Sequence, residues 1–211
     1  TDQPRLFADF GALPAGTVVE VRGVSTDADG SRVANSTTVI VGTDLGSAAP
    51  EQPDVDLSKV VTVPGSHNAA MGCAGDWAPD CDQAQMTQVD GIWRLTVDLP
   101  AGDYEYKVAT EKSWDENYGQ GGVASGPNLV LRHAGGPVTF WFDPRTKVVQ
   151  SSDDGPVVTL AGSFQSELGC AGDWAPDCLR AMMFDGDRDG VYEFSTTKLP
   201  TRSYELKVAH G

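Results

Sequence analysis

The segment Gly72-Cys-Ala-Gly-Asp-Trp-Ala-Pro-Asp-Cys81 occurs a second time, letter for letter, at residues 169–178. An identical pair of segments with two cysteines and a tryptophan indicates an internal duplication of the chain. All four cysteines of the chain lie in these two copies. The duplicated segment is therefore the point from which the fold can be predicted.

The similarity extends to both sides of the duplicated segment. Residues 157–163 repeat the pattern of residues 60–66 at a separation of 97, and residues 204–209 repeat residues 104–109 at a separation of 100. The separation increases from 97 to 100 because the second copy has a small insertion at residues 185–190. The sequence ends at Gly211, before any counterpart of residues 111–150. We expect one module at residues 57–150 and a second, truncated module at 155–211.

Short segments of alternating character predict an all-β fold. In residues 103–109, Tyr104, Tyr106 and Val108 alternate with Glu105 and Lys107, which places the two sets on opposite faces of one strand. Glycine and proline turns separate further β-rich segments at residues 60–63, 92–97, 128–132 and 138–142. Trp93 and Trp141 lie on these segments, and we expect both in the core.

Residues 1–46 are interpreted as the C-terminal part of another domain together with the start of a linker. Strands are predicted at residues 17–24 and 36–41, around a turn at 27–30. Two strands cannot bury a core alone. The pair resembles the last strands of a fibronectin-type-III or immunoglobulin-like sandwich. Residues 43–56 are small, polar and proline-bearing, which is typical of a linker.

The spacing of the cysteines allows two interpretations, a disulfide in each copy or a metal site. The disulfide pairs would be Cys73 with Cys81 and Cys170 with Cys178. Closing a loop of this size stabilises a fold by about 2.5 kcal/mol. Zinc requires four ligands, and the nearest histidine, His67, corresponds to Phe164 in the second copy. We prefer disulfides, which indicate an oxidising, extracellular compartment.

The charge of the chain restricts its partners. Fifteen basic and thirty acidic residues give a formal net charge of −15. Such a chain repels nucleic acid and anionic membrane surfaces, so we expect neither as a partner. No apolar run approaches membrane-spanning length. A neutral ligand such as a sugar is compatible with this charge.

Two acidic patterns suggest metal binding or catalysis. Asp185, Asp187 and Asp189 resemble the start of a calcium loop, but Thr196 stands where an EF-hand has glutamate. We expect a hairpin turn there, with no metal or cofactor, although calcium binding remains an open alternative. Retaining glycosidases need two carboxyl groups facing each other across a sugar. Nothing in the sequence fixes such a pair, so the chain is predicted to be noncatalytic.

Three motifs in order resemble the X25 module of secreted pullulanases and amylopullulanases. They are Gly-Cys-x-x-Asp-Trp-x-Pro-x-Cys, then Leu-Pro-x-Gly-x-Tyr-Glu-Tyr-Lys-Val-Ala at residues 99–109, and Ser-Trp-Asp-Glu-Asn-Tyr-Gly at 113–119. The resemblance extends to the starch-binding SusE and SusF β-sandwich superfamily. It implies tandem immunoglobulin-like β-sandwich modules. It also implies that they are accessory to a secreted α-glucan hydrolase whose catalytic domain lies outside this chain.

The resemblance also directs attention to one loop as a carbohydrate-binding site. Aromatic rings stack on the flat C–H faces of sugars, and nearby polar groups bind the hydroxyls. In the starch-binding relatives, two aromatic residues and a lysine form the usual arrangement. The corresponding residues here would be Trp114, Tyr118 and Lys107, with Asn117 and Asp115 as hydrogen-bonding partners.

Structural roles are the alternative for each of these aromatic residues. Trp114 would then cover one end of the sandwich, and Tyr118 would pack on it. Trp77 and Trp174 lie inside the duplicated segments, where a tryptophan more often packs on the disulfide than binds a ligand. On this alternative, the modules are spacers that bind nothing. Lys207 corresponds to Lys107, but the second copy has no counterpart of the aromatic loop.

Overall fold

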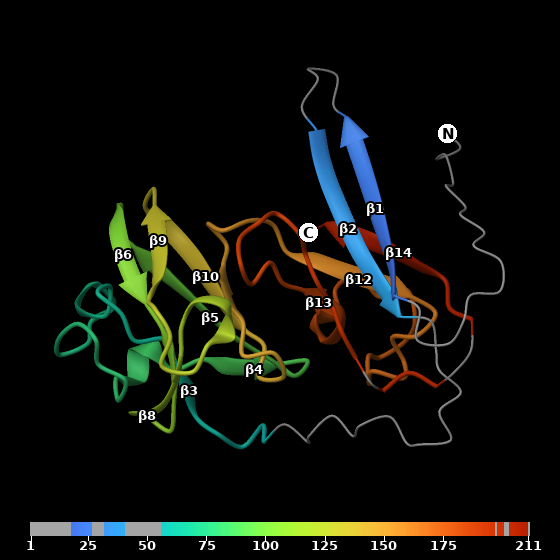
Figure 1. Cartoon of the computed structure of the whole chain (residues 1–211). Coiled ribbons are helices and arrows are strands. Elements are labelled where there is room, and N and C mark those ends of the chain that lie inside the picture. Colours follow the sequence, from blue (N-terminus) through green and yellow to red (C-terminus); the bar gives the residue numbers. More distant parts are fainter. Residues whose placement is uncertain (1–17, 27–31, 41–55, 197, 201–202, 211) are drawn as a thin grey trace.

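The computed structural model describes residues 18–26, 32–40, 56–196, 198–200 and 203–210 (Figure 1). The described residues form β-strands and short 3₁₀ turns, and no α-helix occurs among them. The turns are Ala69–Met71, Asp82–Ala84, Gln120–Gly122 and Leu179–Ala181. This confirms the all-β prediction. None of the helical turns described is long and apolar enough to cross a membrane.

The first repeat contains a four-stranded antiparallel sheet of order β11-β10-β5-β4. Its strands are β4 Thr87–Val89, β5 Ile92–Leu99, β10 Gly136–Phe142 and β11 Val149–Ser151. Opposite it lie the sheet β3-β7-β8 and the pair β6-β9. These strands are β3 Val61–Thr62, β6 Gly102–Tyr106, β7 Val108–Thr110, β8 Ser113–Tyr118 and β9 Leu129–His133. Side chains from the two layers fill the space between them, as in a β-sandwich.

The core of the first repeat follows from the period-2 pattern of its strands. Val138, Phe140 and Phe142 alternate along β10 and are all buried in one cluster. Tyr106 of β6 meets Phe140 edge-on, with ring centroids 5.0 Å apart. Trp93 belongs to the same cluster, as predicted. Large apolar side chains on alternate positions therefore hold the two layers together.

The single strand predicted at residues 103–109 is divided in two at Lys107. β6 pairs with β9, whereas β7 pairs with β3 and β8. At the break, the Lys107 amide donates a hydrogen bond to the Pro64 carbonyl, 2.9 Å away, so the chain moves from one partner to the next. The alternation of buried side chains continues across the break, since Tyr106 and Val108 are both buried.

The second repeat has a smaller sheet of order β13-β12-β14, with strands Met182–Met183, Val158–Gly162 and Leu206–His210. Its core cluster consists of Val158, Leu160, Phe164, Leu168, Ala181 and Met183. Phe184 and Glu193 exchange backbone hydrogen bonds of 3.0 and 2.9 Å. The acidic segment between them is therefore the loop of a hairpin, which agrees with the turn expected there.

A third apolar cluster joins the two repeats. Ile92 and Trp141, on β5 and β10 of the first repeat, pack with Met182 and Phe184 of the second. Trp141 is 8% exposed. Its buried neighbours differ from those of Phe140 and Phe142, because it points to the opposite face of β10. Trp141 was expected in the module's own core, and it is instead buried against the second repeat.

The N-terminal hairpin consists of β1 Val18–Thr26 and β2 Arg32–Ile40. The strands are antiparallel, and the register runs from Val18 opposite Ile40 to Thr26 opposite Arg32. Both predicted strands are present, and β2 begins four residues earlier than predicted, at 32 rather than 36. The turn expected at residues 27–30 and nearly all of the expected linker at 43–56 lie outside the described residues.

Candidate carbohydrate-binding site

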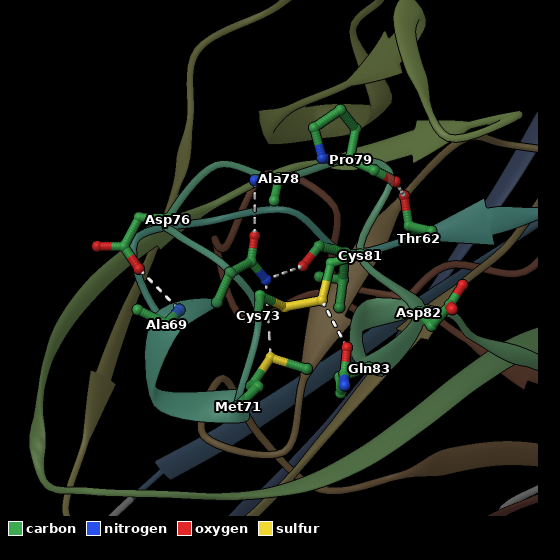
Figure 2. The surroundings of a disulfide bond; sticks show 12 residues. Thr62, Ala69, Met71, Cys73, Asp76, Ala78, Pro79, Cys81, Asp82 and Gln83 are labelled. Carbon is green, nitrogen blue, oxygen red and sulfur yellow. Dashed lines mark hydrogen bonds between the residues drawn. A yellow bond between two sulfur atoms is a disulfide. The ribbon is translucent and has the colours of Figure 1, made fainter.

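The duplicated loop of the first repeat is closed by a disulfide and organised by one buried amide. Cys73 is joined to Cys81. The Asn68 side-chain oxygen accepts hydrogen bonds from the amides of Gly65 and Ala78, at 2.9 and 3.1 Å. Its amide nitrogen donates to the Val63 carbonyl. Figure 2 shows the disulfide and the hydrogen bond at the Ala78 amide. The loop is thus fixed from inside as well as by the covalent bond.

Two further side-chain contacts complete this framework. The Asp76 carboxylate accepts a hydrogen bond of 2.9 Å from the Ala69 amide, and the Thr62 hydroxyl donates to the Pro79 carbonyl at 2.9 Å (Figure 2). These bonds satisfy backbone groups that the irregular loop would otherwise leave unpaired. The path of the loop between its cysteines is therefore specified at several points.

The second repeat reproduces this framework with a different amide. Cys170 is joined to Cys178. The Gln165 side-chain oxygen accepts hydrogen bonds from the amides of Gly162 and Ala175, at 3.2 and 2.7 Å. Asn68 and Gln165 occupy equivalent positions, 97 residues apart. An amide at the same place in both copies was a usable sequence signal, and the sequence reasoning missed it.

The tryptophan of each loop has a left-handed backbone conformation. The φ angles are 57° for Trp77 and 60° for Trp174. Residues with a Cβ avoid this region, and a bulky side chain there is a genuine outlier. Such strain costs on the order of 1–3 kcal/mol and is concentrated at functional sites. The fold therefore holds an indole in a costly conformation twice, at the same point of the same loop.

In the first repeat, this tryptophan lies beside the predicted aromatic loop. The ring centroids of Trp77 and Trp114 are 6.3 Å apart, and the ring planes are tilted by 42°. Trp114 is 39% exposed, and Trp77 is partly exposed. The Trp77 amide donates to the Gly65 carbonyl at 2.9 Å, which anchors the residue to the chain next to β6 and β7. The two indoles form a paired aromatic surface.

Lys107 and Asn117 lie next to this pair. The Lys107 ammonium donates a 3.1 Å hydrogen bond to the Asn117 side-chain oxygen. Asn117, in turn, donates to the Trp114 carbonyl at 2.9 Å, and it is buried. Lys107 is joined by its own amide to Pro64, one residue before the glycine that anchors Trp77. Three of the predicted site residues, Trp114, Lys107 and Asn117, are therefore brought together.

Tyr118 has different surroundings. It lies opposite Val108 in the β7–β8 ladder, packs against the core, and stacks on Phe142 at a centroid distance of 5.9 Å. Its hydroxyl donates to a Glu116 carboxylate oxygen at 2.7 Å, and the ammonium of Lys147 lies over its ring. Partial burial, followed by the contact with Glu116, raises the pKa of Tyr118 to about 12.

Glu116 links this tyrosine to the start of the repeat. Its second carboxylate oxygen pairs with the Lys59 ammonium at 2.5 Å. The Lys59 hydrogen bond, assisted by that of Tyr118, lowers the pKa of Glu116 to about 2. Glu116 is thus ionised, and both of its carboxylate oxygens are already hydrogen-bonded. Asp115, by contrast, is exposed beside Trp114.

The sequence did not predict that Trp77 lies beside Trp114, because Trp77 comes from a distant loop.

The acidic hairpin loop of the second repeat brings three carboxylates together. Oxygens of Asp185, Asp187 and Asp189 lie within 4.8 Å of one another. The Asp185 carboxylate also accepts hydrogen bonds from the amides of Asp189 and Gly190, at 3.1 and 3.0 Å. Partial burial raises the pKa of Asp185. Such bonds to the loop's own backbone are what an aspartate-rich turn requires.

The second repeat presents only part of the aromatic surface. Trp174 is 41% exposed. Lys207, which corresponds to Lys107, is exposed on β14. Among the residues that the structure describes, the paired indoles are those of Trp77 and Trp114 in the first repeat.

Comparisons with known proteins place these features in a family. The family model described as the pullulanase X25 domain matches residues 60–149 and, a second time, residues 157–211. The amylopullulanase of Thermoanaerobacterium thermosulfurigenes is 35% identical over 166 residues, which are 74% of this chain and 9% of that protein. The amylopullulanase of Thermoanaerobacter thermohydrosulfuricus is 34% identical over 162 residues, 72% of this chain and 11% of that protein.

Two solved structures are also similar. The pullulanase from Bacillus acidopullulyticus has a TM-score of 0.40 at 21% identity, over 94% of this chain and 22% of that one. SusF from Bacteroides thetaiotaomicron has a TM-score of 0.28 at 16% identity, over 80% of this chain and 40% of that one. The chain thus spans about a tenth of the length of the curated relatives it matches. On the two matches to the family model, the chain belongs to the pullulanase X25 domain family.

Proposed function

We propose that the first repeat is a noncatalytic α-glucan-binding module and that Trp77 and Trp114 form its sugar-stacking surface. The observation that carries the proposal is the pair of indoles, 6.3 Å apart and tilted by 42°, of which Trp114 is exposed and Trp77 partly exposed. Trp77 also has a left-handed backbone conformation. Such strain costs stability and is concentrated at functional sites, which favours a role in binding.

The geometry of the pair suits an α-linked glucan. Successive glucose rings of such a chain are turned relative to one another, so two tilted indoles match two consecutive rings better than two coplanar ones. Each indole covers a flat C–H face, and the hydroxyl groups remain at the ring edge. The tilt of 42° between Trp77 and Trp114 therefore favours a curved chain over a flat one.

Lys107 supplies the polar part of the proposed site. An ammonium has three N–H donors, and the Asn117 oxygen accepts one of them at 3.1 Å. The other N–H donors would serve the hydroxyl groups of a bound sugar. Asn117 positions both Lys107 and the backbone of Trp114, and Asp115 offers an acceptor at the exposed edge. Tyr118 supports the site by packing behind it rather than by stacking on sugar.

The wider setting of the module is also proposed. The relatives are named amylopullulanases, and the chain covers about a tenth of their length. We infer that it is part of a longer secreted glycoside hydrolase that cleaves α-1,6 and α-1,4 glucosidic bonds in a separate catalytic domain. The two disulfides fit an extracellular location. The second candidate function is that of a spacer, which is favoured by the packed environment of Tyr118.

Affinity electrophoresis of the full chain in gels containing amylose or pullulan tests the proposal. Wild type is expected to be retarded, and Trp77→Ala and Trp114→Ala to weaken binding about tenfold each through loss of stacking. Trp174→Ala is the matched control, because it changes the same loop in the repeat without a paired indole. If wild type is not retarded, the spacer function is correct. If Trp114→Ala is retarded as strongly as wild type, the glucan binds elsewhere.

A further inference from the structure

The two copies differ systematically on one face of the segment that follows the disulfide loop. Residues 82–87 correspond to residues 179–184 at the separation of 97. Met86 and Met183, at equivalent positions, are each buried in the core of their own repeat. Their neighbours on the opposite face are polar and exposed in the first repeat, where they are Gln85 and Thr87. In the second repeat the neighbours are the apolar residues Met182 and Phe184.

These substituted residues are the ones that meet the first repeat. Met182 and Phe184 pack against Ile92 and Trp141, and Leu179 joins the same cluster. Leu179 stands where the first repeat has the exposed Asp82. The apolar change between the copies thus coincides with the contact, and the inward-facing methionine is retained. Figure 1 shows β13 lying beside β10 and β5.

Polar contacts surround this apolar centre. The Arg145 guanidinium is paired with the Asp143 carboxylate at 2.8 Å, donates to the Arg180 carbonyl at 3.2 Å, and lies 5.6 Å from the Phe194 ring centroid. At the other edge, Arg188 pairs with Asp154 at 3.0 Å and donates to the carbonyl of Val130 at 3.1 Å. An apolar centre with a polar margin is the usual anatomy of a specific interface.

We propose that the outer face of β5 and β10, centred on Ile92 and Trp141, is a docking surface for the repeat that follows. The partner that fits it is a repeat with apolar side chains at the positions of Met182 and Phe184. Docking makes the two repeats one rigid, cooperative unit, in which the small second repeat depends on the first for stability. The first repeat has the polar residues Gln85 and Thr87 at the equivalent positions, so it lacks the apolar side chains that this docking requires.

The sequence itself supplies the decisive variant. Met182→Gln with Phe184→Thr copies the residues that the first repeat has at the equivalent positions, so the core cluster of each repeat is left unchanged. In the full chain, hydrogen-exchange mass spectrometry should show that amide protection in β12 falls about a hundredfold, because two large apolar contacts are lost. Protection in β5 should change only a few-fold. Gln85→Met with Thr87→Phe is the matched control and should leave β12 unchanged.

A second variant separates docking from a local folding defect. Ile92→Thr with Trp141→Thr changes only the outer face of the first repeat, yet it should lower protection in β12 by a similar factor. Effects on β12 from both sides of the contact support docking. If β12 keeps wild-type protection in the Met182 and Phe184 variant, the contact does not stabilise the second repeat and the proposal is wrong. If the Ile92→Thr and Trp141→Thr variant leaves amide protection in β12 at the wild-type level, the two repeats fold independently. The proposal is wrong in that case as well.

Discussion

The imidazole of His67 is stacked on Phe140, with ring centroids 5.4 Å apart and ring planes inclined by 20°. It meets Tyr104 edge-on at 6.1 Å and 80°. In the second repeat, Phe164 meets Tyr204 with nearly the same geometry, 6.1 Å and 85°. His67 therefore occupies an aromatic position of the sandwich. Its two ring nitrogens are buried and have no hydrogen-bond partner among the described residues.

This arrangement predicts that the first repeat loses stability in mild acid. Burial lowers the pKa of His67 from 6.5 to about 4, although Asp76 and the backbone of Val63 act in the opposite direction. The folded chain then binds fewer protons than the unfolded chain between these two values. The stability associated with the neutral ring is complete above about pH 6.5 and is lost as the pH falls toward 4. The total change is roughly 3 kcal/mol.

His67→Phe, which copies Phe164, should remove this pH dependence. Urea unfolding at pH 7.5 and 4.5 gives the difference in the free energy of unfolding between variant and wild type at each pH. Carboxylate titration contributes equally to both chains and cancels in this difference. We expect the advantage of the variant to grow by roughly 2–3 kcal/mol on acidification. An advantage that is the same at both pH values would show that His67 is not a buried neutral histidine.

Asn68 should control both the stability of the loop and glucan binding. Asn68→Ala leaves the amides of Gly65 and Ala78 and the carbonyl of Val63 without their partner. Buried groups left unpaired cost about 1–3 kcal/mol each, so we expect a loss of roughly 3 kcal/mol in urea unfolding. Weaker retention on amylose should accompany it, because Ala78 follows Trp77. Asn68→Gln, which copies Gln165, is the control and should lose clearly less; an equal loss would contradict this role.

Local patterns were enough to predict most of the fold, because the relevant contacts lie close in sequence or repeat along it. The duplicated cysteines form a disulfide within each copy, and the alternation of Tyr106 and Val108 matches their burial. The break at Lys107 was not predictable from alternation, because side chains keep their period when a strand changes partners. It depends on the hydrogen bond to Pro64, 43 residues away in sequence (107 − 64).

In the candidate site, too, contacts between residues close in sequence were predictable and contacts between distant residues were not. Trp114, Lys107 and Asn117 lie within one hairpin, so a local motif could identify them together. Trp77 reaches them from another loop, and its pairing with Trp114 depends on how the sandwich closes. The orientation of Trp141 was missed for a related reason. A strand pattern shows that a large residue is buried, but a buried outer face requires a neighbour that only the tertiary structure shows.

The backbone of Trp77 allows the strain at the site to be measured separately from the indole. Trp77→Gly and Trp77→Ala both remove the ring, and they differ only in the Cβ that disfavours a φ of 57°. We expect the glycine variant to be more stable than the alanine variant by about 1 kcal/mol in urea unfolding. Both should lose amylose retention equally, because binding depends on the ring and not on the backbone conformation.

Two further pairs of variants control this comparison. The same substitutions at Trp174, where φ is 60°, should give the same advantage for glycine. At Thr96, an exposed position inside β5, alanine should instead be favoured by about 0.5–1 kcal/mol, because glycine weakens an ordinary strand. Equal stability of Trp77→Gly and Trp77→Ala would mean that the loop relaxes out of the left-handed region. The left-handed conformation would then no longer support a binding role for this tryptophan.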